Sequence, residues 1–331
     1  MSKPVDQPRS SALMNSQLLQ VKDLHVQYFT QRGAVKAVDG VSFEVSQGEV
    51  FGLAGESGCG KSTIAHAILR ILHSPAVITG GEIHFESQDI LGMNQTELEH
   101  FRWQSISLVT QSAMNALNPV ENVASQITDV LEVHAKMPRL DRNQRAAELF
   151  TMVGLDPSRL KDYPHQLSGG MRQRVVIAMA LALNPKMIIM DEPTTALDVI
   201  VQKQIMQKIE DLQSGLGFST MFITHDLSLL VEQSTRIAIM YAGEIVETAP
   251  SRELFAQPYH FYTQGLMNSF PSLTGPKNNL TGIPGAPPDL VNPPSGCRFH
   301  LRCPAAQERC IVEKPAWREI SAGHFAACHL A

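Results

Sequence analysis

The sequence predicts an α/β protein whose buried strands end in polar and charged residues at one edge of a sheet. First, a glycine-rich loop over 55–62 follows the apolar run 50–54 and precedes a helical pattern over 63–71, which gives the order strand, loop, helix. Second, the apolar residues 187–190 end in two acids, as expected of a buried strand that delivers carboxylates to the edge of a sheet. Third, helices and strands alternate from there onward.

Each remaining element follows from its own pattern. Residues 1–16 are polar and rich in Ser and Pro, which predicts disorder. The segments 18–28 and 36–45 alternate like antiparallel strands and predict a β subdomain. Residues 121–160 have helix-like apolar spacing and no comparable strand, so we expect a helical subdomain over about 112–172. The elements predicted after Asp191 are helix 200–214, strand 219–224, helix 226–233 and strands 236–241 and 244–248.

Composition limits the class of protein. The chain has 331 residues, of which 44% are hydrophobic and 18% charged, enough for one large domain and an appendage. A net charge of -5 argues against a non-specific nucleic-acid binder, so we expect no nucleic-acid partner. The longest apolar run, Val175 to Leu183, is shorter than the ~18 residues that span a bilayer, and no signal-peptide core precedes it. We therefore expect a cytosolic protein whose membrane partners are other chains.

The loop over 55–62 has the residues of a phosphate-binding loop. Its glycines permit unusual backbone angles and close approach, and its amides together with the following helix start favour an anion. Lys61 would reach the β and γ phosphates, and the Ser62 hydroxyl would bind Mg²⁺. The thiol of Cys59 is incidental here, because its backbone amide makes the contact. The predicted nucleotide contacts of this loop are Gly55, Ser57, Gly58, Cys59, Gly60, Lys61, Ser62 and Thr63.

The two acids that end the run 187–190 predict the hydrolytic part of the site. Adjacent residues on a strand face opposite ways. Asp191 would therefore approach the Mg²⁺ shell, while Glu192 would point toward the water that attacks the γ-phosphate. The alternative, an exposed acidic turn, fits poorly beside so apolar a strand.

A second anion site is predicted at Leu167-Ser168-Gly169-Gly170, which precedes a helical pattern from Met171 to Ala182. The first loop already encloses the phosphates on one side, so a nucleotide held between two such sites would join two subunits. The alternative is an ordinary helix start capped by Ser168.

These ordered motifs resemble those of the ATP-binding subunits of ABC transporters over about 28–270. The resemblance implies the ABC ATPase fold, with a RecA-like mixed sheet, an N-terminal antiparallel β subdomain and a helical subdomain, together spanning 17–270. It implies head-to-tail dimers that hold ATP between the phosphate loop of one chain and the signature loop of the other. The roles it implies are Gln111 near Mg²⁺, Asp198 in the D-loop, His225 at the γ-phosphate, and Tyr28 stacked on adenine, unless Phe29 takes that role or the Tyr28 ring belongs to the core.

A narrower resemblance is to the oligopeptide and dipeptide importer branch, which includes nickel and some glycan importers. It is carried by the stretches 167–174 and 115–119 and by the cysteine-bearing tail from Gly296. It implies a heterodimer with a sister ATPase, two membrane permease subunits, an extracellular or periplasmic binding protein, and a peripheral location on the cytoplasmic face of the inner membrane. Met171 replaces the glutamine that many ABC signatures carry at this position, but it fits this branch. The residues flanking Gln111 depart from the branch pattern, which leaves the permease partner and the cargo open.

Other classes remain open at this stage. ABC ATPases of DNA maintenance contain long heptad segments, and those of translation hold two ATPase domains in tandem; this sequence has neither feature. A regulatory partner that does not hydrolyse ATP is a third alternative, but Glu192 and His225 are both present. A transport ATPase is therefore the leading interpretation.

Four cysteines lie in the segment 296–331, which a Pro-rich linker over 271–295 joins to the ATPase body. Clustered thiols in a reducing cytosol favour a metal. The resemblance favours a [4Fe-4S] cluster, zinc is the alternative, and the third interpretation is unliganded thiols that pack a small tail. His300, His324 and His329 are spare ligand candidates. The predicted cluster ligands are Cys297, Cys303, Cys310 and Cys328.

Overall fold

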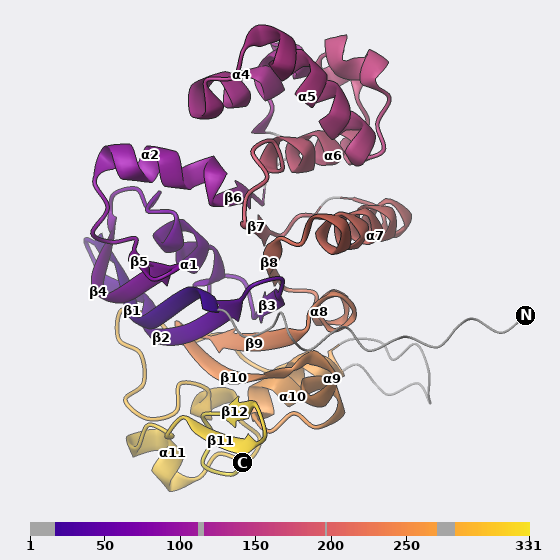
Figure 1. Cartoon of the computed structure of the whole chain (residues 1–331). Helices are drawn as coiled ribbons and strands as arrows, with labels where there is room; N and C mark the ends of the chain where they lie inside the picture. The colour runs from indigo at the N-terminus through magenta and orange to yellow at the C-terminus, as the bar shows by residue number, and fades with distance from the viewer. Residues whose placement is uncertain (1–16, 112–115, 196, 270–281) are drawn as a thin grey trace, which may run out of the picture.

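The computed structural model describes residues 17–111, 116–195, 197–269 and 282–331 (Figure 1). The disorder predicted for 1–16, the first part of the predicted linker and Asn115 of the branch stretch lie outside the described residues. Within the described ranges, no helix is both long and apolar enough to cross a membrane.

The larger of two sheets has eight strands in the order β11-β12-β10-β9-β3-β8-β7-β6. Strands β9, β3, β8, β7 and β6 are parallel, whereas β10, β12 and β11 add antiparallel pairs. The predicted mixed α/β sheet is therefore confirmed. The strands are β3 (Val50–Ala54), β6 (Ile106–Val109), β7 (Met187–Asp191), β8 (Ser219–Thr224), β9 (Arg236–Tyr241), β10 (Glu244–Pro250), β11 (Arg318–Ser321) and β12 (His324–Ala326).

The smaller sheet is antiparallel, with the order β2-β1-β4-β5. Its first two strands confirm the predicted N-terminal β subdomain. The later two come from a stretch for which the sequence pattern predicted no element. The strands are β1 (Gln17–Thr30), β2 (Gly33–Ser46), β4 (Ala76–Phe85) and β5 (Gln88–Asp89).

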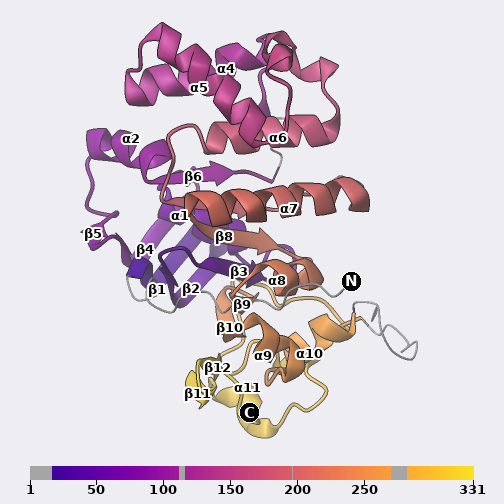
Figure 2. The same ribbon diagram turned by 45° about the vertical axis from the view of Figure 1, so that its right-hand side comes forward.

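Helices cover the central sheet and extend to one end of the molecule. Figures 1 and 2 both show α4, α5 and α6 at the end opposite the C-terminal segment. The helices are α1 (Lys61–Ile68), α2 (Gln95–Gln104), α4 (Val123–Ala135), α5 (Arg139–Met152), α6 (Gly169–Ala180), α7 (Val199–Leu216), α8 (Leu227–Gln233), α9 (Ser251–Ala256), α10 (Phe261–Asn268) and α11 (Glu308–Val312), with short 3-10 turns η1 (Pro157–Lys161), η2 (Pro164–Gln166) and η3 (His300–Arg302).

The central strands are buried on both faces. Every residue of β3, β7 and β8 is buried, which explains why β3 and β7 are nearly continuous apolar runs rather than alternating ones. Apolar side chains from the two faces form two core clusters, one under the helices α4 to α7 and one between β3 and the N-terminal sheet. The loops at the carboxyl ends of these strands therefore rest on a rigid base.

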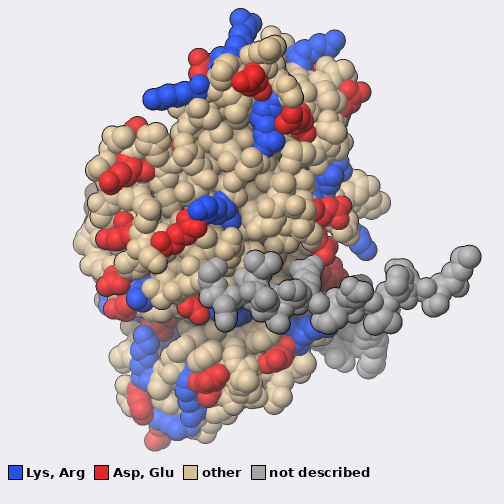
Figure 3. Space-filling model, viewed as in Figure 1, with Lys and Arg blue, Asp and Glu red and all other residues tan. Residues whose placement is uncertain are grey.

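The C-terminal segment is an extension of the central sheet. Strand β12 pairs with β10 through Glu247 opposite Ala326 and Thr248 opposite Phe325. In the linker that precedes this segment, the Leu290 carbonyl accepts a hydrogen bond from the Lys36 N–H of β2 at 2.9 Å. Both the linker and the extension thus contact the ATPase body. On the face seen in Figure 3, basic and acidic side chains are interspersed over both parts.

Candidate nucleotide-binding and hydrolysis site

The loop between β3 and α1 has a backbone that requires glycine. Gly55, Gly58 and Gly60 have φ values of 155°, 81° and 110°, which L side chains rarely adopt. A Cβ on Gly55 would lie 2.2 Å from the Met240 carbonyl oxygen, and one on Gly60 equally close to that of Ala37. The loop is therefore pressed against the strands behind it, as a cradle for phosphate requires.

Lys61 places a positive charge inside this loop. Its Nζ donates to the carbonyls of Gly55 at 2.8 Å and Glu56 at 3.0 Å, and the residue is only 6% exposed. Among the described residues, no ion pair neutralises this ammonium. A buried, uncompensated cation beside a helix start suits a phosphate group.

Asp191 and Ser62 form a small oxygen-rich site at the carboxyl end of β7. Asp191 is 4% exposed, and its buried Oδ1 has no hydrogen-bond partner among the described residues. Burial raises the pKa of Asp191, and the hydrogen bond with Ser62 opposes that rise. An unpartnered buried carboxylate oxygen beside a hydroxyl fits Mg²⁺, which prefers oxygen ligands.

Glu192 is the centre of a hydrogen-bonded group. Its Oε1 lies 3.0 Å from His225 Nδ1, and its Oε2 accepts from Gln111 Nε2 at 3.0 Å and from Thr195 Oγ1 at 2.9 Å. Burial alone would raise the pKa of Glu192, but the hydrogen bonds with His225 and Thr195 outweigh it and lower the pKa overall. The structure thus brings three predicted residues together as an ionised, oriented carboxylate, and adds Thr195.

The orientation of Glu192 has a different cause from the predicted one. Strand β7 ends at Asp191, and Glu192 has a left-handed φ of 47° while its N–H donates to the Ile223 carbonyl at 2.8 Å. A turn stabilised by the neighbouring strand β8, and not strand alternation, therefore sends the two carboxylates different ways.

The predicted adenine contact lies beside the first helix. The Tyr28 hydroxyl is 3.2 Å from Thr63 Oγ1, and the ring is half-buried, whereas Phe29 is 53% exposed. Ser57 is exposed in the loop, and burial raises the pKa of the Cys59 thiol. The roles predicted for these side chains in nucleotide binding stay predictions.

Among the described residues, no hydrogen bond joins the signature loop, 167–170, to the phosphate loop, 55–62. Ser168 Oγ caps α6 by accepting from the Met171 N–H at 3.3 Å, and a Cβ on Gly170 would lie 2.6 Å from Val201 Cγ1. Asp198 caps α7 in the same manner. The contacts predicted for Ser168, Gly169, Gly170 and Asp198 with nucleotide stay predictions.

The prediction of a metal in the cysteine-bearing tail is wrong. Among the described residues, which include all four of these cysteines, no group of three or more His, Cys, Asp or Glu could hold a metal ion. Cys297, Cys303, Cys310 and Cys328 line one small cavity. Burial raises the pKa of Cys297 to about 11.

The spare histidines have other partners. His324 pairs with Glu247 at 2.7 Å, His300 Nδ1 lies 2.8 Å from the Cys297 carbonyl, and His329 Nε2 lies 2.9 Å from the Glu313 carbonyl. In this structure the cysteines pack as small apolar side chains. The [4Fe-4S] cluster and its zinc alternative are therefore both withdrawn.

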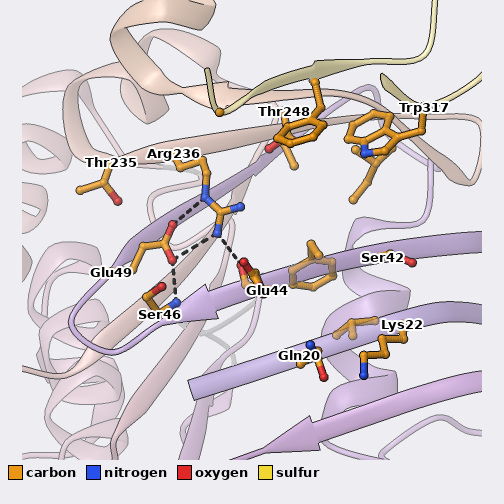
Figure 4. Close-up of a pocket in the computed structure, with 16 residues that line it drawn as sticks. Gln20, Lys22, Ser42, Glu44, Ser46, Glu49, Thr235, Arg236, Thr248 and Trp317 are labelled. Atoms are coloured by element: carbon orange, nitrogen blue, oxygen red, sulfur yellow. Dashed lines mark hydrogen bonds and ion pairs between the residues drawn. The ribbon is translucent and has the colours of Figure 1, made fainter. Parts of the chain in front are cut away.

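A separate cavity of about 590 Å³ lies between β1, β2, β9 and the C-terminal hairpin (Figure 4). Arg236 occupies its wall, where Glu49 pairs with it at 2.9 Å, and Phe43 and Trp317 contribute aromatic rings. None of the residues predicted for the nucleotide site lines it, so the chemistry described above lies elsewhere.

Comparisons with known proteins agree with this geometry. The family described as ABC transporter matches residues 38–195, and the family described as oligopeptide/dipeptide transporter, C-terminal region, matches residues 246–310. The oligopeptide transport ATP-binding protein OppD of Bacillus subtilis is 44% identical over 94% of this chain and 88% of its own length. The dipeptide transport ATP-binding protein DppD of Caldanaerobacter subterraneus is 40% identical over 95% and 97%.

A solved structure supports the fold. The ATP-binding cassette MJ0796, in a dimeric post-hydrolysis state bound to ADP and phosphate, matches with a TM-score of 0.63 and 29% identity over 71% of this chain and 99% of its own. The fold and the site thus define an ABC-type ATPase. The chain belongs to the ABC transporter family, within the branch of ATP-hydrolysing subunits that carry the oligopeptide/dipeptide C-terminal region.

Proposed function

We propose that this chain hydrolyses ATP to drive the import of oligopeptides or dipeptides through a separate membrane permease. The observation that carries the proposal is the Glu192 carboxylate, held by His225, Gln111 and Thr195 at the head of a buried strand. The matched C-terminal region and the names of the relatives favour peptides over nickel or oligosaccharides as cargo. Neither they nor the fold favour a role in translation or DNA maintenance.

The residues of the site divide the work of phosphoryl transfer. Lys61 and the glycine-loop amides bind and orient the phosphates of ATP, and Tyr28 holds the adenine. Glu192 orients and polarises the attacking water, and His225 keeps the carboxylate in place and contacts the γ-phosphate. Ser62 and Asp191, with Gln111, would hold Mg²⁺, which would neutralise charge on the phosphates.

The exposed signature loop supports an ATP-dependent partner. Ser168 is exposed, and the helix start behind it can accept an anion. A second ATPase subunit, in our proposal a sister chain, presents its own signature loop to the phosphate loop of this chain and receives this one in return. The pair works beneath two permease subunits, on the cytoplasmic face of the inner membrane, with a binding protein outside that delivers the peptide.

The division of the chain follows the same proposal. Residues 17–270 form the ATPase domain, with the helical subdomain over about 112–172 facing the partner and the permease. Residues 271–295 link this domain to the segment 296–331, whose strands continue the central sheet.

Reconstitution in membranes tests this proposal. The chain is combined with its sister ATPase, permease and binding protein in lipid vesicles, and phosphate release is measured with and without a di- or oligopeptide. We expect peptide-loaded binding protein to stimulate hydrolysis and peptide to accumulate inside, with both lost in the Glu192→Gln variant. Hydrolysis without peptide accumulation would contradict the cargo, and the absence of hydrolysis would contradict the enzymatic role.

A further inference from the structure

An ion pair joins the C-terminal extension directly to the phosphate loop. Arg302, in η3, donates from Nη1 and Nη2 to the two carboxylate oxygens of Glu56 at 2.7 and 2.9 Å. Glu56 directly follows Gly55 in the loop, 246 residues earlier in the chain. The Arg302 side chain is 5% exposed and that of Glu56 is 27% exposed. Two-pronged, partly buried pairs of this kind fix geometry as well as charge.

The guanidinium is itself held in place. Arg302 Nε donates to the Pro284 carbonyl at 2.8 Å and Nη2 to that of Ile283 at 3.3 Å. Its Cζ lies 5.7 Å from the centroid of the Tyr241 ring, within the range of a cation–π contact. Both the nitrogen atoms and the planar face of the guanidinium therefore have partners. These contacts fix the position of the group that binds Glu56.

Glu56 connects Arg302 to Lys61, the lysine predicted to bind phosphate. Its carbonyl accepts from Lys61 Nζ at 3.0 Å, and its N–H donates to the Tyr262 hydroxyl at 2.8 Å. Tyr262 is fully buried and packs against Phe299 of the extension, with ring centroids 5.4 Å apart. The side chain, the amide and the carbonyl of one loop residue thus connect the extension to the ammonium of Lys61.

The other half of the loop has an indirect link to the extension. Arg298 donates to the Ala242 carbonyl and pairs with Asp39 and Glu244. Gly243, which follows Ala242, donates its N–H to the carbonyl of Cys59 in the loop at 3.0 Å. Two arginines of the extension therefore support the phosphate loop from opposite ends.

The ion pair with Arg302 also changes the charge of the phosphate loop. A free carboxylate on Glu56 would place negative charge in the loop that binds the phosphates of ATP, and like charges at close range repel strongly in a partly buried site. Arg302 cancels this charge and fixes the backbone that holds Lys61.

We propose that Arg302 is a positioning residue through which the C-terminal extension sets the affinity of the phosphate loop for ATP. This inference rests on the proposed ATP site. It assigns the extension a part in nucleotide binding, acting through Glu56, without direct contact between Arg302 and ATP.

A double-mutant cycle on the full-length chain tests the inference, with the Kd for MgATP as the readout. We expect Arg302→Gln to raise the Kd by about tenfold, since it leaves the Glu56 charge unpaired beside the phosphates. In the Glu56→Gln background the same Arg302 substitution should change the Kd less than twofold, because its target is gone. An equal loss in both backgrounds, or a change below threefold for Arg302→Gln in the native background, would overturn the proposal.

Two further variants keep the result interpretable. Arg32→Gln breaks another ion pair between the ATPase body and the linker, with Asp289 at 2.7 Å, at an exposed position, and should leave the Kd within twofold. If Arg302→Gln does not fold, Arg302→Lys, which keeps the charge and loses the two-pronged contact, replaces it in the cycle with the same non-additivity required. Failure of the unsubstituted chain to bind MgATP would contradict the proposed function, whereas binding with an additive cycle contradicts only this inference.

Discussion

The two predicted anion sites of this chain differ in how completely the chain builds them. The loop before α1 is supported by Met240 and Ala37 behind its glycines, by Arg302 at Glu56, and by its own buried Lys61. The loop before α6 has an exposed Ser168 whose hydroxyl caps its own helix. We therefore propose that the first loop binds a nucleotide in a single subunit, and that the second loop contacts nucleotide only when another subunit supplies the phosphates.

The largest effect is expected at the hydrolytic carboxylate of the complete site. Glu192→Gln removes the charge that polarises the attacking water but keeps the size of the side chain beside Gln111 and His225. Phosphate release by the assembled transporter should fall by about 10²–10³-fold, while the Kd for MgATP changes less than threefold. Unchanged steady-state hydrolysis would remove Glu192 from its assigned role.

A smaller effect is expected on binding. Lys61→Ala removes the buried ammonium and should raise the Kd for MgATP about 100-fold, because charge-assisted contacts to phosphate are lost. The matched control is Lys186→Ala, whose exposed ammonium pairs with Glu86 at 2.6 Å away from the loop and should not alter the Kd. Equal affinities for the two variants, measured by titration calorimetry, would show that the first site is not the one described.

The third prediction concerns the incomplete site. Ser168→Ala should lower hydrolysis in the assembled transporter about tenfold and leave the Kd of the single chain unchanged. Ser168→Asp keeps a capping oxygen but brings negative charge toward the phosphates of the partner's nucleotide, so it should retain thermal stability and lose hydrolysis. A weaker Kd for the isolated chain in either variant would mean that the loop acts within its own subunit.

Sequence reasoning found the motifs but not the contacts between distant segments. The buried strands β3 and β7 are predictable because parallel strands covered on both faces are nearly continuous apolar runs. The strand β4 was missed because Gly80 and Gly81 interrupt its pattern, and β6 because four residues are too short for periodicity to register.

The site shows the same division. Local spacing predicted the places of Lys61 after the glycine-rich loop and of Glu192 after a buried strand, and their roles in catalysis and binding stay predictions. The partners Thr195 and Arg302 have no local signal, because the contact of Arg302 with Glu56 spans 246 residues. The metal prediction failed because cysteine count and spacing do not fix where the side chains lie, and among the described residues no group of three or more potential ligands could hold a metal ion.

The smallest predicted effect is a pH dependence of the support beneath the complete site. His260 Nδ1 accepts from the Tyr262 N–H at 3.0 Å, and burial lowers the pKa of His260 to about 4 even though the nearby Glu247 opposes this. The unfolded chain, with a His pKa of about 6.5, binds the proton more readily, so stability is lost as the pH falls below that value. The free energy of unfolding should drop by about 1 kcal/mol from this group between pH 7.5 and pH 6.

Urea unfolding at the two pH values measures this loss. The matched variant His260→Asn keeps an acceptor for the Tyr262 N–H but does not titrate. Between pH 7.5 and pH 6 its free energy of unfolding should therefore fall by about 1 kcal/mol less than that of the unsubstituted protein. The same pH dependence in both proteins would show that His260 is not the group responsible.

The most direct test of the central claim is association that depends on ATP. The chain carrying Glu192→Gln is mixed with its sister ATPase subunit, and the molar mass is measured by sedimentation with MgATP, with MgADP and without nucleotide. We predict a two-subunit species that forms with MgATP and is absent with MgADP, and that Ser168→Asp in both chains abolishes. A molar mass that does not change with nucleotide would contradict the claim that ATP is held between the phosphate loop of one subunit and the signature loop of the other.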